Sequence, residues 1–155
     1  MSTRRALVAI ALLLLVLAIV SPHGSSSKGP YHADIVRSPG VLNPEVTQAN
    51  INATICVQGW TKTIRPPTSY TNALKRKQMR EYGVGGSPSD YQEDHLISLE
   101  LGGDPRDPRN LWPEPRPRAE DVDRTENELH AAICSRHVTL AEAQRRISQI
   151  KHTAG

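Results

Sequence analysis

The sequence predicts a small α+β domain with two or three flanking helices and one disulfide bond. Three observations support this class: short segments with strand-like patterns, three segments with helical spacing of apolar residues, and a total of two cysteines. The chain has 155 residues, which allows one domain with a modest core. This length excludes a multidomain enzyme with a separate cofactor module.

The first segment has the layout of an export signal. Arg4 and Arg5 precede an apolar run over residues 6–20, and a polar stretch rich in serine follows it. As a helix this run would span about 22 Å, which is shorter than the ~30 Å apolar core of a bilayer. We therefore expect residues 1–22 to be an export signal or an uncleaved N-terminal anchor, and the folded part to be extracytoplasmic, either secreted or anchored. The membrane would be a partner only if this segment stays uncleaved.

The charge balance limits the kinds of partner. Without Arg4 and Arg5, 17 basic and 16 acidic residues leave a net charge of +1. A charge this small excludes a histone-like polycation, so any contact with nucleic acid must come from local clusters of basic residues.

Residues 23–50 are expected to form a flexible tether, because Pro and Gly interrupt them and no periodic pattern is sustained. The compact domain is expected to cover residues 51–155. From Ile51 to Val57 apolar and polar residues alternate, which predicts a short strand.

Three helices are predicted after this strand. Thr71 or Asn72 can cap the first, and Pro117 suits the first turn of the second. Thr139 and Glu142 form a capping box before the third. The predicted ranges are 71–82, 117–134 and 140–150.

Basic residues cover one face of the first predicted helix. Arg76, Lys77 and Arg80 lie opposite its apolar face, and no acidic residue occurs between positions 62 and 80. A surface that contacts phosphate groups of nucleic acid and an ordinary solvated helix face both agree with this pattern.

The residues that could carry chemistry lie between the helices. Asp94 and His95 stand at the head of a predicted strand, a Gly-Gly turn follows at 102–103, and Asn110 begins a second short strand before the next helix. Arg109 belongs to a basic group beside this motif, which either grips phosphates or pairs with neighbouring acids.

This order resembles the HNH, or ββα-metal, nuclease family. It is most similar to a smaller group of exported bacterial proteins with an Asp-His-Leu-Ile-Pro-Leu-Glu-Leu-Gly-Gly core followed by Asn-Leu-Trp-Pro. The resemblance covers about residues 54–148, and Ser98 stands where proline is usual in the group. It implies a small ββα-metal core and hydrolysis of phosphodiesters.

By this resemblance Asp94 would bind a metal ion, His95 would be the general base, and Asn110 would brace the loop between the strands. A phosphodiester is negatively charged, so attack by water needs charge neutralisation and a base that is neutral near pH 7. Mg²⁺ is the expected ion, with Mn²⁺, Zn²⁺ or Ni²⁺ as alternatives, and the substrate would be DNA or RNA.

The metal ligand that the family's helix supplies is missing from its usual place. Many relatives also carry a lysine after that ligand, and the corresponding position here is Val122. Glu126 is the first candidate, because it lies on the apolar face of its helix, where an unpaired carboxylate would be costly to bury. A metal ion or an arginine partner would remove that cost. Asp123 is the second candidate.

The two cysteines, Cys56 and Cys134, are expected to form the disulfide, since an even count is typical of exported small domains. Two buried free thiols are the alternative.

Three functions stay open. The first is an exported, divalent-metal-dependent HNH-type endonuclease that acts on DNA or RNA with little sequence specificity. The second is a catalytically inactive extracytoplasmic domain that binds nucleic acid or a partner on the same fold. The third is a small envelope protein whose acidic residues and histidines bind metal. We expect a monomer with no small-molecule cofactor.

Overall fold

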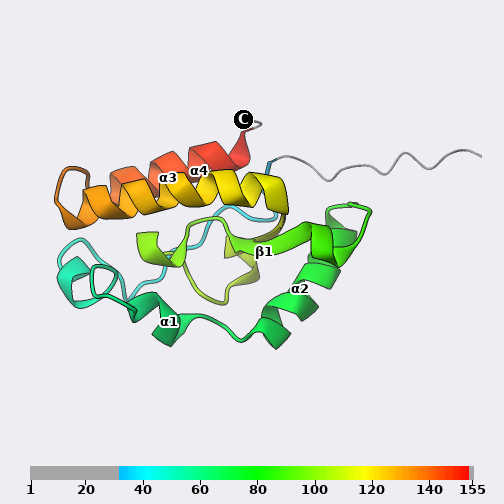
Figure 1. The fold of residues 1–155 in the computed structure, drawn as a ribbon, viewed down its shortest axis with the longest axis horizontal. Helices are drawn as coiled ribbons and strands as arrows, with labels where there is room; N and C mark the ends of the chain where they lie inside the picture. Colours follow the sequence, from blue (N-terminus) through cyan, green and yellow to red (C-terminus); the bar gives the residue numbers. More distant parts are fainter. Residues whose placement is uncertain (1–31, 154–155) are drawn as a thin grey trace, which may run out of the picture.

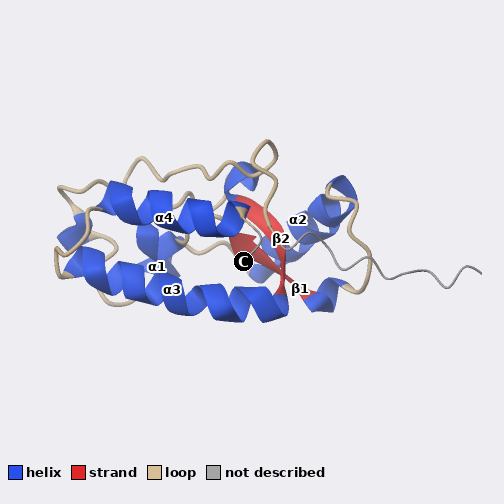
Figure 2. Ribbon diagram, turned by 90° about the horizontal axis from the view of Figure 1, so that it is seen from above, coloured by secondary structure: helices blue, strands red, loops and turns tan. Residues whose placement is uncertain are grey.

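The computed structural model describes residues 32–153, so the predicted export signal lies outside the described residues. A two-stranded antiparallel sheet lies between two groups of helices (Figures 1 and 2). The α3–α4 pair runs along one side of the sheet, and α1 and α2 lie on the other side. The helices and strands are α1 (Trp60–Ile64), α2 (Thr68–Glu81), β1 (Tyr91–His95), β2 (Leu111–Pro115), α3 (Arg116–Cys134) and α4 (Leu140–His152).

The predicted α+β class and the disulfide are confirmed by this arrangement. In the register of the sheet, Asp94 of β1 lies opposite Trp112 of β2, and His95 lies opposite Leu111. The strands follow one another through a loop over residues 96–110, and α3 begins directly after β2. Within residues 32–153, no helix is long and apolar enough to cross a membrane.

The core forms where the α3–α4 pair packs against the sheet and its loop. Trp112 is fully buried, and its ring lies 6.4 Å from the ring of Tyr82 at the end of α2. Trp112 belongs to one hydrophobic cluster with apolar residues of the β1–β2 loop and of both long helices, which include Leu96, Leu101, Ile133 and Ile147.

The predicted strand at 51–57 is wrong. These residues form a 3₁₀ turn, η1 (Ile51–Ala53), followed by further turns. Ile51 and Ile55 are buried, whereas Val57 is 45% exposed. The two buried apolar residues are therefore four positions apart, which is the spacing of a helical turn and not the alternation of a strand.

Residues 32–50, which were expected to belong to a tether, pack against the domain. The backbone N–H of Ala33 donates to the carbonyl of Lys151 over 2.8 Å, and the buried Ser38 hydroxyl donates to the carbonyl of Leu111, also over 2.8 Å. Leu42 forms an isolated antiparallel bridge with Gly103. The compact body therefore begins further toward the N-terminus than residue 51.

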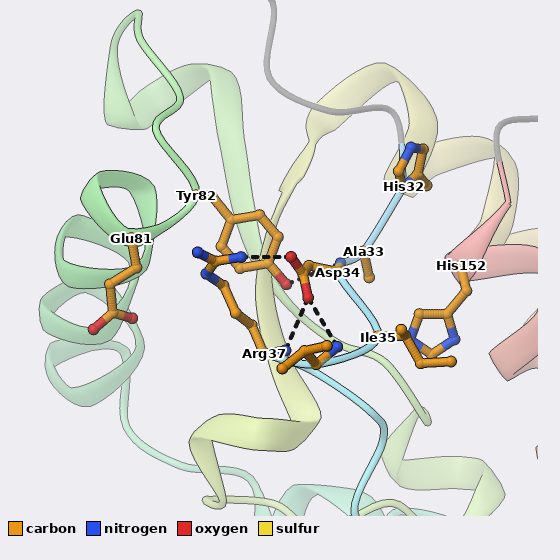
Figure 3. A pocket seen from close by; sticks show the side chains of 9 residues that line it. His32, Ala33, Asp34, Ile35, Arg37, Glu81, Tyr82 and His152 are labelled. Carbon is orange, nitrogen blue, oxygen red and sulfur yellow. Dashed lines mark hydrogen bonds and ion pairs between the residues drawn. The ribbon is translucent and has the colours of Figure 1, made fainter.

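A hollow of about 590 Å³ marks the place where this segment meets α2 and α4 (Figure 3). In it the Asp34 carboxylate accepts from the Arg37 guanidinium and from the N–H of Val36, and Arg37 lies over the ring of Tyr82. The Tyr82 hydroxyl donates to Ser38 over 2.9 Å. These contacts hold residues 34–38 against α2, so the polar groups that line this hollow have a structural role.

The predicted helices are all present, with small shifts at their ends. The first begins at Thr68 after Pro67, earlier than the predicted cap at Thr71 or Asn72. Pro117 lies in the first turn of α3, and the Thr139 hydroxyl accepts from the N–H of Glu142 at the start of α4, as predicted.

The disulfide joins Cys56 to Cys134, whose Cα atoms lie 5.6 Å apart and whose positions in the sequence differ by 78. Its reduction is expected to lower the free energy of unfolding by about 4 kcal/mol, because the reduced unfolded chain regains the entropy of a long open loop. Urea unfolding with and without a dithiol reductant measures this loss. The double variant Cys56→Ser/Cys134→Ser should match the reduced protein, and equal stability of the oxidised and reduced forms would contradict the expectation.

Candidate functional site

His95, at the end of β1, is held in one orientation by the loop that follows it. Its Nε2 atom lies 3.1 Å from the backbone carbonyl of Pro105. A carbonyl only accepts hydrogen bonds, so Nε2 carries the hydrogen and Nδ1 keeps a free lone pair. Burial lowers the pKa of His95, against the opposing charge of Asp94. The imidazole is therefore neutral at pH 7 and has one basic nitrogen, which is the state that a general base needs.

Asn110 fastens the β1–β2 loop from within. Its buried side chain accepts from the N–H of Ile97 over 2.9 Å and donates to the carbonyl of Ile97 over 3.0 Å. It also donates to the carbonyl of Asp104 over 2.9 Å, next to Pro105. Asn110 thus makes the hydrogen bonds expected of a brace, and it fixes the segment that orients His95.

An ammonium group lies among the acidic residues of the site. Lys151 of α4 is fully buried, and its Nζ contacts the carboxylate of Asp94, lies 2.7 Å from Glu126 and 3.7 Å from Glu114. The same Nζ donates to the backbone carbonyl of His95 over 2.7 Å. Asp94 and Glu126, two of the three residues expected to bind metal, therefore share a lysine as their common partner.

The protonation of this cluster follows from burial and from the lysine. Burial disfavours the Asp94 carboxylate, but the Lys151 charge and hydrogen bonds outweigh it and lower the pKa of Asp94 to about 2. Burial raises the pKa of Glu114 to about 9 and that of Glu126 to about 7, partly offset by Lys151. Burial opposes the charge of Lys151, yet the three neighbouring carboxyl groups raise its pKa. At neutral pH the cluster holds an Asp94–Lys151 ion pair beside a protonated Glu114.

The expected joint metal site of Asp94 and Glu126 does not fit this arrangement. A divalent ion bound to both carboxylates would lie within about 5 Å of the Lys151 ammonium, because metal–oxygen distances are near 2–2.5 Å. The like charges would repel each other in a buried and weakly screened place. Asp94 is thus placed as the partner of Lys151.

The two helix candidates, Glu126 and Asp123, line a cleft of about 230 Å³ beside this cluster. The Ser98 hydroxyl is buried without a hydrogen-bond partner and belongs to the same lining. Oxygen donors of this kind suit Mg²⁺ or Mn²⁺. The other lining residues are Thr61, Arg65, Leu99, Glu100 and Asn127.

The acidic residues of the cleft fit an ion that keeps part of its water shell. Glu100, Asp123 and Glu126 do not bring three ligand atoms within 4.8 Å of one another. Mg²⁺ usually retains several waters and takes one or two carboxylates from a protein, so this spacing agrees with its chemistry. Burial raises the pKa of Asp123 and of Glu100, as expected for carboxylates that face a confined space.

A separate Cys/His group has the spacing of a metal site. Among residues 32–153, Cys56, His130 and Cys134 form the one group of at least three Cys, His, Asp or Glu side chains whose ligand atoms lie within 4.8 Å of one another. Both sulfurs are joined in the disulfide. Thiolate ligands would therefore exist there only in the reduced protein.

The basic residues expected to contact nucleic acid are exposed but lie outside the cleft lining. Arg76, Lys77 and Arg80 are on α2, where Lys77 pairs with Glu81 over 3.2 Å. Arg109 is paired with Asp107 over 2.6 Å. Arg65, after α1, is the basic residue that lines the cleft.

The sequence does not single out Lys151, and it gives Glu114 only as an acid with which the neighbouring basic group could pair; Arg118 does pair with it over 3.1 Å. Lys151 lies four residues after Ile147, so it continues the buried stripe of α4, and a lysine in that position signals a buried acidic partner. Glu114 sits in β2 without any such periodic signal. No protein-family model, curated protein or solved structure matches the chain. The function must therefore be inferred from the chain's own residues.

The buried acids give the fold an unusual pH dependence. We expect the free energy of unfolding to fall from pH 6.5 to 9, because burial raises the pKa of Glu93 to about 8, that of Glu114 to about 9 and that of Glu126 to about 7. In this range the folded state keeps protons that the unfolded chain has lost, at about 1.4 kcal/mol per pH unit for each such group. The lowered pKa of Asp94 acts only at acid pH, where its stabilisation is lost as the pH falls toward 2.

Urea unfolding at pH 6.5, 7.5 and 9 measures this slope. Glu93 offers a clean variant, because both of its carboxylate oxygens are buried without a hydrogen-bond partner. Glu93→Gln should reduce the slope up to pH 8, and a stability that rises from pH 6.5 to 9 would contradict the assignment.

Proposed function

We propose that the chain is an exported, divalent-metal-dependent endonuclease of the HNH type, which hydrolyses nucleic-acid phosphodiesters with little sequence specificity. One observation supports this most directly. The bond from His95 Nε2 to the Pro105 carbonyl leaves Nδ1 as a base in a neutral imidazole. Asn110 keeps the carbonyl-bearing loop in place through three hydrogen bonds.

In this proposal His95 Nδ1 takes the proton from the attacking water. A divalent ion, when bound, supplies positive charge for the phosphate and for the leaving oxygen. Asp123 would hold it, together with the Glu126 oxygen that is not the one paired with Lys151, and Ser98 would be a further oxygen donor. Arg65 and Asn127 line the same cleft and can donate to phosphate oxygens. The disulfide agrees with an oxidising compartment outside the cytoplasm.

A second function has its own supporting observation. The ion pair between Asp94 and Lys151 occupies the carboxylate that the resemblance assigns to metal. This favours a catalytically inactive extracytoplasmic domain that binds nucleic acid or a partner.

Nicking of a supercoiled plasmid separates the two functions. The oxidised protein, residues 23–155, is incubated with plasmid or RNA in the presence of Mg²⁺, Mn²⁺ or EDTA. Residues 32–50 are included because they belong to the compact body. We expect cleavage that requires the metal and is lost in Asp123→Asn. Asp121→Asn is the matched control, since Asp121 is exposed on the same helix and does not line the cleft. Binding of DNA by the folded protein without cleavage under any ion would support the inactive domain instead.

A further inference from the structure

We propose that Lys151 is a built-in cation, and that the oxygen atoms around its ammonium group form a latent divalent-metal site which opens when that group is removed. This site shares Glu126 with the cleft, but Asp94 and Glu114 do not line the cleft. The oxygens come from three elements, β1, β2 and α3, which converge on one side chain of α4.

The surroundings of Lys151 resemble the shell of a bound ion. Nζ contacts Asp94, lies 2.7 Å from Glu126 and 2.7 Å from the carbonyl of His95, with Glu114 at 3.7 Å. Nζ donates hydrogen bonds to the Asp94 carboxylate and the His95 carbonyl, and the Glu126 carboxylate is its ion-pair partner. Carboxylate and carbonyl oxygens are also the ligands that Mg²⁺ and Mn²⁺ prefer.

Burial makes the ammonium group necessary. Lys151 and Glu114 are both 0% exposed, and Glu126 is 7% exposed. Arg118 Nε lies 3.1 Å from Glu114 and stays with it. Without Lys151, however, the carboxyl groups of Asp94 and Glu126 lose the cation that both contact. Such burial is costly unless they take up protons or another cation. The cluster therefore selects for a cation, and the chain supplies it covalently.

Lys151→Met removes the charge and little else. Methionine keeps an apolar stem but ends one atom before the position of Nζ, so it vacates the place of the ammonium group. Lys75→Met is the matched control, since Lys75 is also buried but its Nζ donates to the backbone carbonyl of Tyr91 over 3.0 Å.

Equilibrium dialysis with Mn²⁺, followed by electron paramagnetic resonance of the free ion, tests the proposal. We expect Lys151→Met to bind one more Mn²⁺ ion per chain than the wild type, and Lys75→Met to bind the same number as the wild type. The additional ion should disappear in Lys151→Met/Glu114→Gln and persist in Lys151→Met/Asp123→Asn. An ion that is lost in Asp123→Asn belongs to the cleft and tests the proposed nuclease, whereas an ion that is lost in Glu114→Gln tests the latent site. The two proposals can therefore fail independently.

Stability is the second readout. If Lys151→Met unfolds in the absence of metal, millimolar Mn²⁺ should restore the fold, because binding energy at such a site adds to folding energy. A folded variant that binds no additional ion, or an unfolded one that Mn²⁺ does not restore, overturns the proposal. So does a wild-type protein whose Mn²⁺ binding is lost in Asp94→Asn, because Asp94 would then already ligate metal beside the lysine.

Discussion

Exchange of His95 for alanine is expected to slow plasmid nicking by about 10²–10⁴-fold, the usual contribution of a general base. The loss follows from the chemistry of Nδ1, which is the basic nitrogen left by the hydrogen bond to Pro105. His95→Gln sharpens the test, because a glutamine amide can still donate to that carbonyl but does not take up a proton near pH 7. Both variants should lose activity, and the glutamine variant should keep most of its stability.

The pH profile gives an independent check on the same residue. Burial lowers the pKa of His95, so the half-maximal rate of cleavage should lie at a pH below the pKa of about 6.5 that a free histidine has. His137→Ala serves as the control, since His137 is an exposed loop residue that contacts Ser135. A His95→Gln variant that cleaves at the wild-type rate would remove His95 from the mechanism.

Gly103→Ala is expected to destabilise the fold by about 4 kcal/mol or more, in the range reached only when a buried feature is broken. A Cβ atom at this position would lie 1.8 Å from the carbonyl oxygen of Ile97 and 2.6 Å from Nδ2 of Asn110. Both atoms belong to the brace of the β1–β2 loop. The backbone must therefore move, and the loop that orients His95 moves with it.

Gly59→Ala is the matched control for this variant. Gly59 has a φ of 82°, but no other atom lies within 4 Å of the added Cβ. Its cost should be limited to backbone strain of about 1–2 kcal/mol. Urea unfolding of both variants measures the difference, and equal losses would show that the close approach at Gly103 is not what fixes the loop.

The sequence predicted those parts of the fold that depend on neighbouring residues. Thr139 caps its helix because the hydroxyl meets an N–H three positions later, and Pro117 sits in the first turn of α3 for an equally local reason. The segment 51–57 could not be decided in the same way. Ile51 and Ile55 satisfy both an alternating and a helical-turn pattern, and only packing against the rest of the domain shows which is used.

In the candidate site, too, the residues that depend on near neighbours in the sequence could be predicted, and those that depend on distant ones could not. His95 and Asn110 lie within one short motif, so their roles could be proposed from the residues themselves. The partner of Asp94 could not, because Lys151 lies 57 residues further along the chain. The expected pairing of Asp94 and Glu126 through a metal thus became a pairing through a lysine, since no local pattern shows which cation meets a buried carboxylate.

The position of Lys151 in α4 also bears on how the domain folds. Asp94 and Glu126 are synthesised before Lys151, which neutralises them. β1 and α3 therefore cannot pack together with water excluded until α4 has docked. The hairpin, α3 and α4 must therefore form cooperatively, even though the strands and α3 are adjacent in sequence. A proteolytic cut in the 135–139 turn should therefore unfold the hairpin and α3 together with α4, and should not detach α4 from an otherwise folded domain.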